Sequence, residues 1–131
     1  MLRLSESLRI FAATSREHFH KGIDGLVEMV RTSLGEDPLS GDLFCFFNRR
    51  HNQVKILVWD RNGFWILRKR LERGRFERID RREAWVEFDR VRFAMLLAGL
   101  DTRTARFHSY FAREIRISRR DDVGGRARLA E

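Results

Sequence analysis

Residues 54–71 read Val54-Lys55-Ile56-Leu57-Val58-Trp59-Asp60-Arg61-Asn62-Gly63-Phe64-Trp65-Ile66-Leu67-Arg68-Lys69-Arg70-Leu71. Two apolar runs flank a short turn signal, which predicts a β-hairpin with strands at residues 54–59 and 64–71. The order from Asp60 to Gly63 is typical of a type I turn followed by a left-handed glycine. We therefore expect replacement of Gly63 by alanine or valine to disturb the register of the hairpin.

The second strand of this hairpin leads into a cluster of basic residues. Residues 49–82 contain 12 Lys and Arg against 4 Asp and Glu, and the whole chain has a formal net charge of +8. Residues 1–48 contain 5 basic and 7 acidic residues, so the positive charge is concentrated after them. This imbalance favours acidic partners, above all nucleic acid, whose phosphates attract Lys and Arg whatever the base sequence.

The size and composition of the chain suit one folded domain. Of its 131 residues, 43% are hydrophobic and 35% are charged. We expect a single α+β domain at residues 1–100 and a partly disordered, Arg-rich C-terminal extension at residues 101–131. Cys45 is the one cysteine, which excludes a disulfide within the chain. We expect a cytoplasmic protein without membrane contact, because no secretory signal and no transmembrane-length apolar segment is present.

Apolar runs outside the hairpin predict further strands and a first helix. Strands are expected at residues 8–13, 43–47 and 84–88, and the middle one is apolar enough to lie at the centre of a sheet. A helix that ends at Gly35 is expected. Its buried stripe would consist of Ile23, Leu26, Val27, Val30 and Leu34, which recur at helical spacing.

A second helix is predicted after the last of these strands. It would run from Arg90 to Leu97, with Asp89 as its N-terminal cap and Gly99 beyond its end. Together the elements predict an α+β fold. In it a small, mainly antiparallel sheet contains the basic β-hairpin, and one or two helices pack on one face of the sheet.

Four blocks of the sequence, in this order and spacing, are similar to one known family. They are Lys21-Gly22-Ile23-Asp24-Gly25-Leu26, Asp37-Pro38-Leu39-Ser40-Gly41-Asp42-Leu43-Phe44, Lys55-Ile56-Leu57-Val58-Trp59-Asp60 and Lys69-Arg70-Leu71-Glu72-Arg73-Gly74-Arg75-Phe76. Over residues 8–100 the chain resembles the TnpB accessory proteins, which bacterial transposable elements of the insertion sequence 66 family encode in their second open reading frame. The resemblance implies a small protein that assists a separate, larger transposase, and it implies neither a catalytic centre nor a cofactor.

The basic residues around the hairpin are the candidate nucleic-acid-binding residues. Backbone contact is the expected mode, because no helix-turn-helix or zinc signature identifies a base reader. The alternative is an ordinary solvated surface of charged residues. The candidates are Arg49, Arg50, Lys55, Arg68, Lys69, Arg70, Arg73 and Arg75.

The neighbouring aromatic residues have two interpretations. Trp59, Phe64, Trp65 and Phe76 could stack on unpaired bases. Filling the core is the interpretation we favour, since aromatic residues in strands usually do so. Trp65, beside the turn, is the best candidate for an exception.

Other polar residues offer weaker signals. His18 and His20 could bind a metal together with Glu17, Asp24 or Glu28, but the spacing of the histidines places them on one face only in a strand, and no cysteine supports them. A metal-dependent nuclease would need several converging carboxylates, whereas most acidic residues here are interspersed with arginine. Cys45 lies in an apolar run, which indicates a buried side chain rather than a nucleophile.

The sequence thus predicts a non-enzymatic accessory protein of transposition, without metal or cofactor. It would bind DNA, such as the transposon ends, through the basic hairpin edge and act with the transposase of the same element. The alternative is a protein-interaction module that contacts the transposase or another accessory protein without binding DNA directly.

Overall fold

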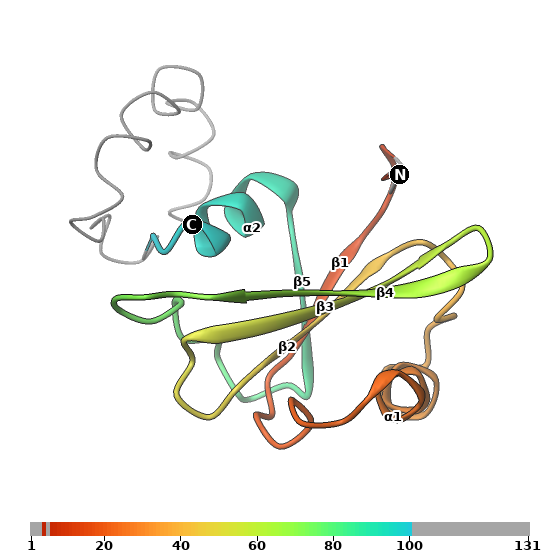
Figure 1. Ribbon diagram of the computed structural model, residues 1–131, viewed down its shortest axis with the longest axis horizontal. Coiled ribbons are helices and arrows are strands. Elements are labelled where there is room, and N and C mark those ends of the chain that lie inside the picture. The colour runs from red at the N-terminus through yellow and green to blue at the C-terminus, as the bar shows by residue number, and fades with distance from the viewer. Residues whose placement is uncertain (1–3, 5, 101–131) are drawn as a thin grey trace.

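The computed structural model describes residue 4 and residues 6–100, so the predicted C-terminal extension lies outside the described residues. The elements in chain order are β1 (Ile10–Ala13), α1 (Ile23–Met29), the π-helical segment η1 (Val30–Leu34), β2 (Leu43–Phe47), β3 (Gln53–Asp60), β4 (Gly63–Arg70), β5 (Trp85–Phe88) and α2 (Arg90–Leu97). The strands of this part of the chain form one five-stranded sheet in the order β4-β3-β2-β1-β5 (Figure 1).

The sheet is antiparallel except between β1 and β2. These two strands are parallel, and Ile10 pairs with Leu43. Parallel neighbours need a crossover connection, which α1 and η1 supply. The pairs β2–β3, β3–β4 and β1–β5 are antiparallel. The predicted α+β fold with a small, mainly antiparallel sheet is therefore confirmed.

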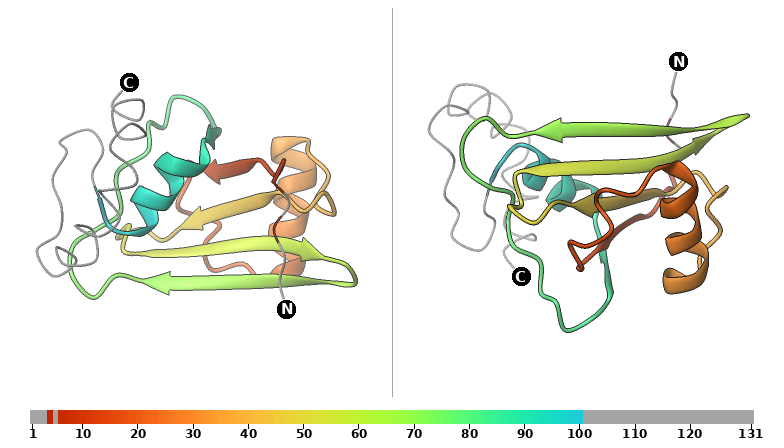
Figure 2. Two further views of the ribbon diagram at one scale, coloured as in Figure 1. Left: turned by 90° about the horizontal axis from the view of Figure 1, so that it is seen from above. Right: turned by 60° about the horizontal axis from the view of Figure 1, so that its bottom comes forward.

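Both faces of the sheet are apolar, and each is covered by one helix. All five residues of β2 are buried, and successive residues of a strand point to opposite faces. Phe44 packs with Leu26 of α1, whereas Cys45 belongs to the cluster that contains Phe93 of α2. Figures 1 and 2 show the two helices on opposite sides of the sheet. The expectation that the helices pack on one face is therefore wrong, because the uninterrupted apolar run of β2 requires cover on both faces.

The helices end where the sequence signals place their ends. Gly35 closes η1 with a φ of 75°. The side chain of Asp89 accepts a 2.8 Å hydrogen bond from the backbone N–H of Arg92 and so caps α2. Gly99, with a φ of 82°, follows the end of α2. Ile23 departs from the predicted buried stripe, since it is exposed. Within residue 4 and residues 6–100, no helix has the length and apolar character that crossing a membrane requires.

The hairpin forms as predicted, but its turn has a different conformation. Asp60 pairs with Gly63, and the N–H of Asn62 donates a 2.6 Å hydrogen bond to the carbonyl of Asp60, as in a γ-turn. The left-handed residue is Arg61, with a φ of 59°, and not Gly63. A Cβ atom on Gly63 would meet no atom within 4 Å. The prediction of a left-handed Gly63 is wrong. The structure therefore gives no physical reason for Gly63→Ala to disturb the register of the hairpin.

Candidate nucleic-acid interface

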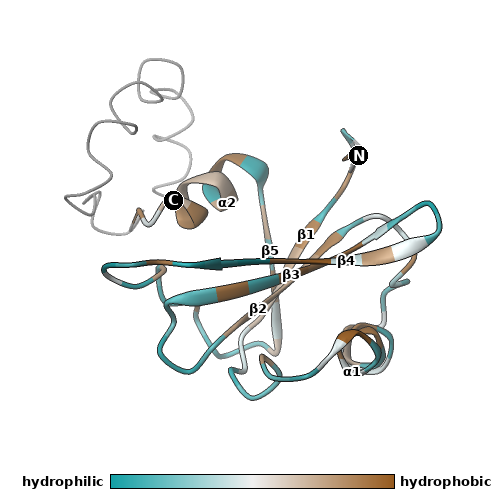
Figure 3. Ribbon diagram, viewed as in Figure 1, coloured by the Kyte–Doolittle hydropathy of each residue, from teal (hydrophilic) through white to brown (hydrophobic). Residues whose placement is uncertain are grey.

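The pleat of β4 divides the predicted basic residues between the two faces of the sheet. Lys55 pairs with Arg68 across β3 and β4, and both lie on the α1 side together with Arg70. Lys69 points to the other side. There its Nζ donates a 2.8 Å hydrogen bond to the carbonyl oxygen of Leu97, at the C-terminal end of α2, where a cation also complements the helix dipole. Figure 3 shows the same strand change from hydrophobic to hydrophilic along its length.

Lys55 and Arg68 both lie over the aromatic ring of Phe19 on the α1 side. The Lys55 Nζ lies 4.8 Å and the Arg68 guanidinium 5.4 Å from the ring centroid of Phe19. Burial lowers the pKa of Lys55, and the nearby Arg68 lowers it further. Farther along β4, Arg70 forms a 2.9 Å ion pair with Glu72, and this hydrogen-bonded carboxylate raises the pKa of Arg70. The eight predicted residues therefore do not share one surface.

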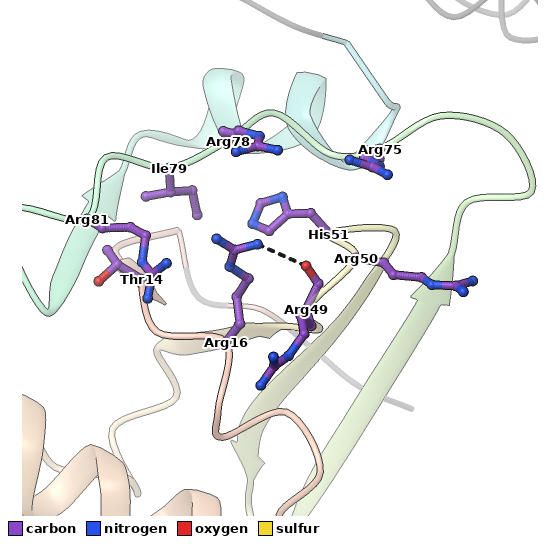
Figure 4. A pocket seen from close by; sticks show the side chains of 9 residues that line it. All are labelled: Thr14, Arg16, Arg49, Arg50, His51, Arg75, Arg78, Ile79 and Arg81. Carbon is purple, nitrogen blue, oxygen red and sulfur yellow. Dashed lines mark hydrogen bonds between the residues drawn. The ribbon is translucent and has the colours of Figure 1, made fainter.

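Three of the predicted residues, Arg49, Arg50 and Arg75, meet elsewhere, at a hollow of about 100 Å³ (Figure 4). We call this hollow the arginine pocket. Six of its nine lining residues are arginines, and none of these described residues is acidic. The lining consists of Thr14, Arg16, Arg49, Arg50, His51, Arg75, Arg78, Ile79 and Arg81.

The parallel pairing of β1 and β2 brings two walls of the arginine pocket together. The C-terminal ends of parallel neighbours lie at the same edge of a sheet, so Arg16, after β1, comes close to the loop after β2. Its Nη1 donates a 2.9 Å hydrogen bond to the backbone carbonyl of Arg49. Thr14 joins this wall to the segment before β5, because its N–H donates a 3.0 Å hydrogen bond to the carbonyl of Ala84.

Phe76 fixes the third wall, which consists of residues 75–81. Its ring is buried and contacts the ring of Phe47 edge-on, with centroids 5.6 Å apart. The Phe76 N–H donates a 2.7 Å hydrogen bond to the carbonyl of His51, and the His51 Nδ1 lies 3.1 Å from the carbonyl oxygen of Phe76. These contacts hold a basic segment in place that would otherwise be an exposed loop.

His51 is a buried histidine among arginines. Its ring stacks on Phe47 with centroids 4.5 Å apart, and its backbone has a φ of 60°. Burial lowers the pKa of His51, the hydrogen bond to the carbonyl of Phe76 opposes that effect, and the charges of Arg16, Arg78 and Arg75 lower the pKa further. His51 is therefore neutral near neutral pH, and the positive charges around the pocket are one cause of its lowered pKa.

His51 is expected to make the stability of the protein depend on pH. The pKa of His51 is about 6.5 in the unfolded chain and lower in the folded protein. Below pH 6.5 the unfolded chain therefore binds more protons than the folded protein. The stability that neutral His51 contributes is lost as the pH falls through this range. Melting temperatures of wild type and His51→Asn between about pH 5.5 and 7.5 check this. The wild type is expected to lose more stability toward acid, and parallel curves for the two proteins would contradict the prediction. Asparagine suits the test because it tolerates positive φ.

Acidic residues neutralise few of the pocket arginines. Glu72 pairs with Arg70, Asp80 with Arg82, and the buried Glu77 with Arg92, none of which lines the pocket. Within the described part of the chain, no ion pair involves the lining residues Arg16, Arg49, Arg50, Arg78 or Arg81.

Three of the pocket arginines were not among the sequence candidates. Arg78 and Arg81 belong to a basic segment whose density of arginines was a usable signal. Arg16 is separated from Arg49 by 33 residues along the chain, and no local pattern indicates that the two meet.

Most aromatic residues near the hairpin pack against other side chains instead of facing solvent. Trp59 and Phe64 contact each other edge-on at 5.0 Å, and Phe76 is 2% exposed. Trp65 is 47% exposed, and its indole N–H donates a 3.1 Å hydrogen bond to the carboxylate of Asp60. Trp65 is thus the exposed exception among them.

The residues considered for metal binding and nucleophilic chemistry lie apart from the arginine pocket. His20 is exposed and contacts the ring of Phe19 edge-on at 5.5 Å. Among the described residues, no group of three or more His, Cys, Asp or Glu side chains is arranged to hold a metal ion. Cys45 is buried in β2, as predicted, and burial raises the pKa of its thiol.

Comparison with known proteins gives a family but no characterised relative. Two similar proteins of Sinorhizobium fredii (strain NBRC 101917 / NGR234) are described as uncharacterized. The protein y4jC is 36% identical over 107 residues, 81% of this chain and 92% of its own length. The protein y4hO is 30% identical over 103 residues, 79% of this chain and 90% of its own length. No solved structure is significantly similar to the chain.

The family model described as IS66 Orf2 like protein matches residues 8–107. It begins at the residue where the resemblance to the TnpB accessory proteins begins, and it extends beyond residue 100, where that resemblance was expected to end. The chain therefore belongs to the IS66 Orf2-like family, whose members are accessory proteins of insertion-sequence transposition.

Proposed function

We propose that this protein binds DNA at the arginine pocket while it assists the transposase of the same element. The observation that carries the proposal is that six arginines, from three separate segments, line one hollow without an acidic lining residue in the described chain. Like charges held together repel one another, and a phosphate backbone offsets this repulsion. Lys55 and Arg68 extend the proposed interface on the α1 side. Lys69 is left out, because its Nζ is bonded to the end of α2.

Fluorescence anisotropy with a transposon-end duplex and an unrelated duplex, at about 50 and 200 mM salt, tests the proposal. The double variant Arg49→Ala/Arg78→Ala is expected to bind DNA roughly tenfold or more weakly at the lower salt concentration. The slope of log affinity against log salt concentration should also become less negative by roughly 1.8 in this double variant. Each phosphate contact contributes about 0.9 to that slope, and two contacts are removed.

A matched control removes the same charge outside the pocket. The double variant Arg31→Ala/Arg61→Ala changes one exposed residue in η1 and one in the hairpin turn. It is expected to bind DNA within about twofold of the wild type, because these positions affect only the overall field. An equal loss of affinity in both double variants, or no binding by the wild type at low salt, would overturn the proposal.

Among the described residues, no strand pairs with the outer edge of β4, and this favours a second candidate function, which is docking onto the transposase. β4 is a terminal strand of the sheet, and an unpaired strand edge accepts a further strand from a partner. Trp65 and Leu67 are alternate residues of β4, 47% and 38% exposed. Capture of the tagged transposase from nuclease-treated lysate, and its loss in Trp65→Ser/Leu67→Ser, would support this function. Capture that disappears on nuclease treatment would contradict it.

A further inference from the structure

We propose that the arginine pocket is a receptor for one phosphate monoester group, which in this protein is the terminal phosphate of a DNA strand. The inference rests on the proposed function for the source of the phosphate. It goes further by assigning the chemistry of the bound group and the part of the strand that carries it. A free phosphorylated small molecule has the same chemistry, and the experiment below separates the two sources.

The charge of the lining suits a doubly charged group better than a singly charged one. Arg16, Arg49, Arg78 and Arg81 line the pocket without an ion pair to another described residue. A phosphate monoester carries a charge of about −1.5 to −2 near neutral pH, whereas each phosphodiester within a strand carries a single negative charge. The monoester therefore gains more from the same arginines.

The shape of the pocket favours a strand end. Its walls come from three segments, which follow β1, follow β2 and precede β5, and they enclose about 100 Å³. In Figure 4 the side chain of Arg16 points into this space between His51 and Ile79, whereas Arg49 and Arg50 at its rim point away from it. A phosphodiester has the strand continuing on both sides, so it reaches only the rim. A terminal phosphate is attached on one side and can enter.

The groups that would hold the phosphate are fixed before it binds. Arg16 is bonded to the carbonyl of Arg49, and His51 is held between the ring of Phe47 and the carbonyl of Phe76. Because the His51 Nδ1 faces a carbonyl oxygen, the neutral ring carries its proton there and keeps Nε2 as an acceptor. Preorganisation of this kind reduces the entropy cost of binding.

Two single strands of identical sequence test the inference, one ending in a phosphate and the other in a hydroxyl. The phosphorylated strand is expected to bind roughly tenfold more tightly, which corresponds to hydrogen bonds with one additional charged group. Inorganic phosphate alone should shift the NMR signals of the His51 ring and compete with the phosphorylated strand. Arg78→Gln should remove the preference for the phosphorylated strand. Arg82→Gln, a nearby arginine paired with Asp80 outside the pocket, should keep it.

The outcomes separate this inference from the proposed function. Equal affinity for the two strands, with no effect of phosphate on His51, overturns the terminal-phosphate receptor but leaves DNA binding intact. Binding of neither strand, with no effect of phosphate, overturns both. Inorganic phosphate that binds as tightly as the phosphorylated strand identifies a free phosphate compound as the source and overturns the assignment to a strand end.

Discussion

Replacing Phe76 with alanine is expected to lower the free energy of unfolding by about 3–5 kcal/mol, the usual cost of removing a buried phenyl ring. Phe76 is 2% exposed, and it belongs to the same buried cluster as Phe47, Leu71 and Phe93. The loss is a large fraction of the roughly 5–15 kcal/mol that stabilises a typical domain. The arginine pocket should be affected as well, because Phe76 anchors the wall formed by residues 75–81.

Urea denaturation measures this effect, with Trp65→Ala as the matched aromatic control. Trp65 lies in β4 and is 47% exposed, so its loss should cost less than about 1 kcal/mol. A similar decrease in the denaturation midpoint for both variants would contradict the structure, since it would mean that Phe76 is no more buried than Trp65.

Replacing Arg92 with methionine is expected to destabilise the protein by roughly 3 kcal/mol, because it removes a guanidinium that pairs with a buried carboxylate. The side chain of Glu77 is fully buried, and its Oε2 lies 2.6 Å from Nη2 of Arg92. Arg92 is part of α2, so the ion pair between Glu77 and Arg92 connects the segment after Phe76 to this helix. Methionine keeps an unbranched apolar chain near Phe88, over which the Arg92 guanidinium lies.

A double-mutant cycle isolates the contribution of the pair. The double variant Glu77→Gln/Arg92→Met is expected to recover part of the lost stability, because it removes the charge of the buried carboxylate together with that of its partner. Arg82→Met serves as the surface control, since Arg82 and Asp80 form an exposed ion pair and should leave the denaturation midpoint unchanged. If the double variant is less stable than the sum of its single variants predicts, the buried charge is not the cause of the loss.

Much of the local structure was predictable because the signals act over a few residues. The apolar run at Leu43–Phe47 forms the predicted central strand. Asp89 caps α2 because its carboxylate reaches the N–H three residues later, and that geometry is set within one helical turn. The turn of the hairpin was predicted less well. The pattern from Asp60 to Gly63 indicated a left-handed glycine, but the pairing of these two residues moves the positive φ to Arg61.

The candidate site was only partly predictable. The density of arginines after residue 48 indicated the basic character of this region, and Arg49, Arg50 and Arg75 do line the arginine pocket. The sequence did not reveal that Lys69 faces α2 while Lys55 and Arg68 face α1. Strand alternation separates them, yet the side of the sheet that each helix covers depends on the path of the chain between strands.

The sequence is enough to predict the α+β class, the basic hairpin, the capped helix α2 and the membership in the IS66 Orf2-like family. That the two helices cover opposite faces, and that distant arginines line one pocket, follows only from the folded arrangement of the chain. Arg16 meets Arg49 because β1 and β2 are parallel neighbours, so the residues that follow them lie at the same edge of the sheet. Residue patterns reflect contacts between near neighbours in the chain, whereas this pocket depends on strand pairing between segments far apart in it.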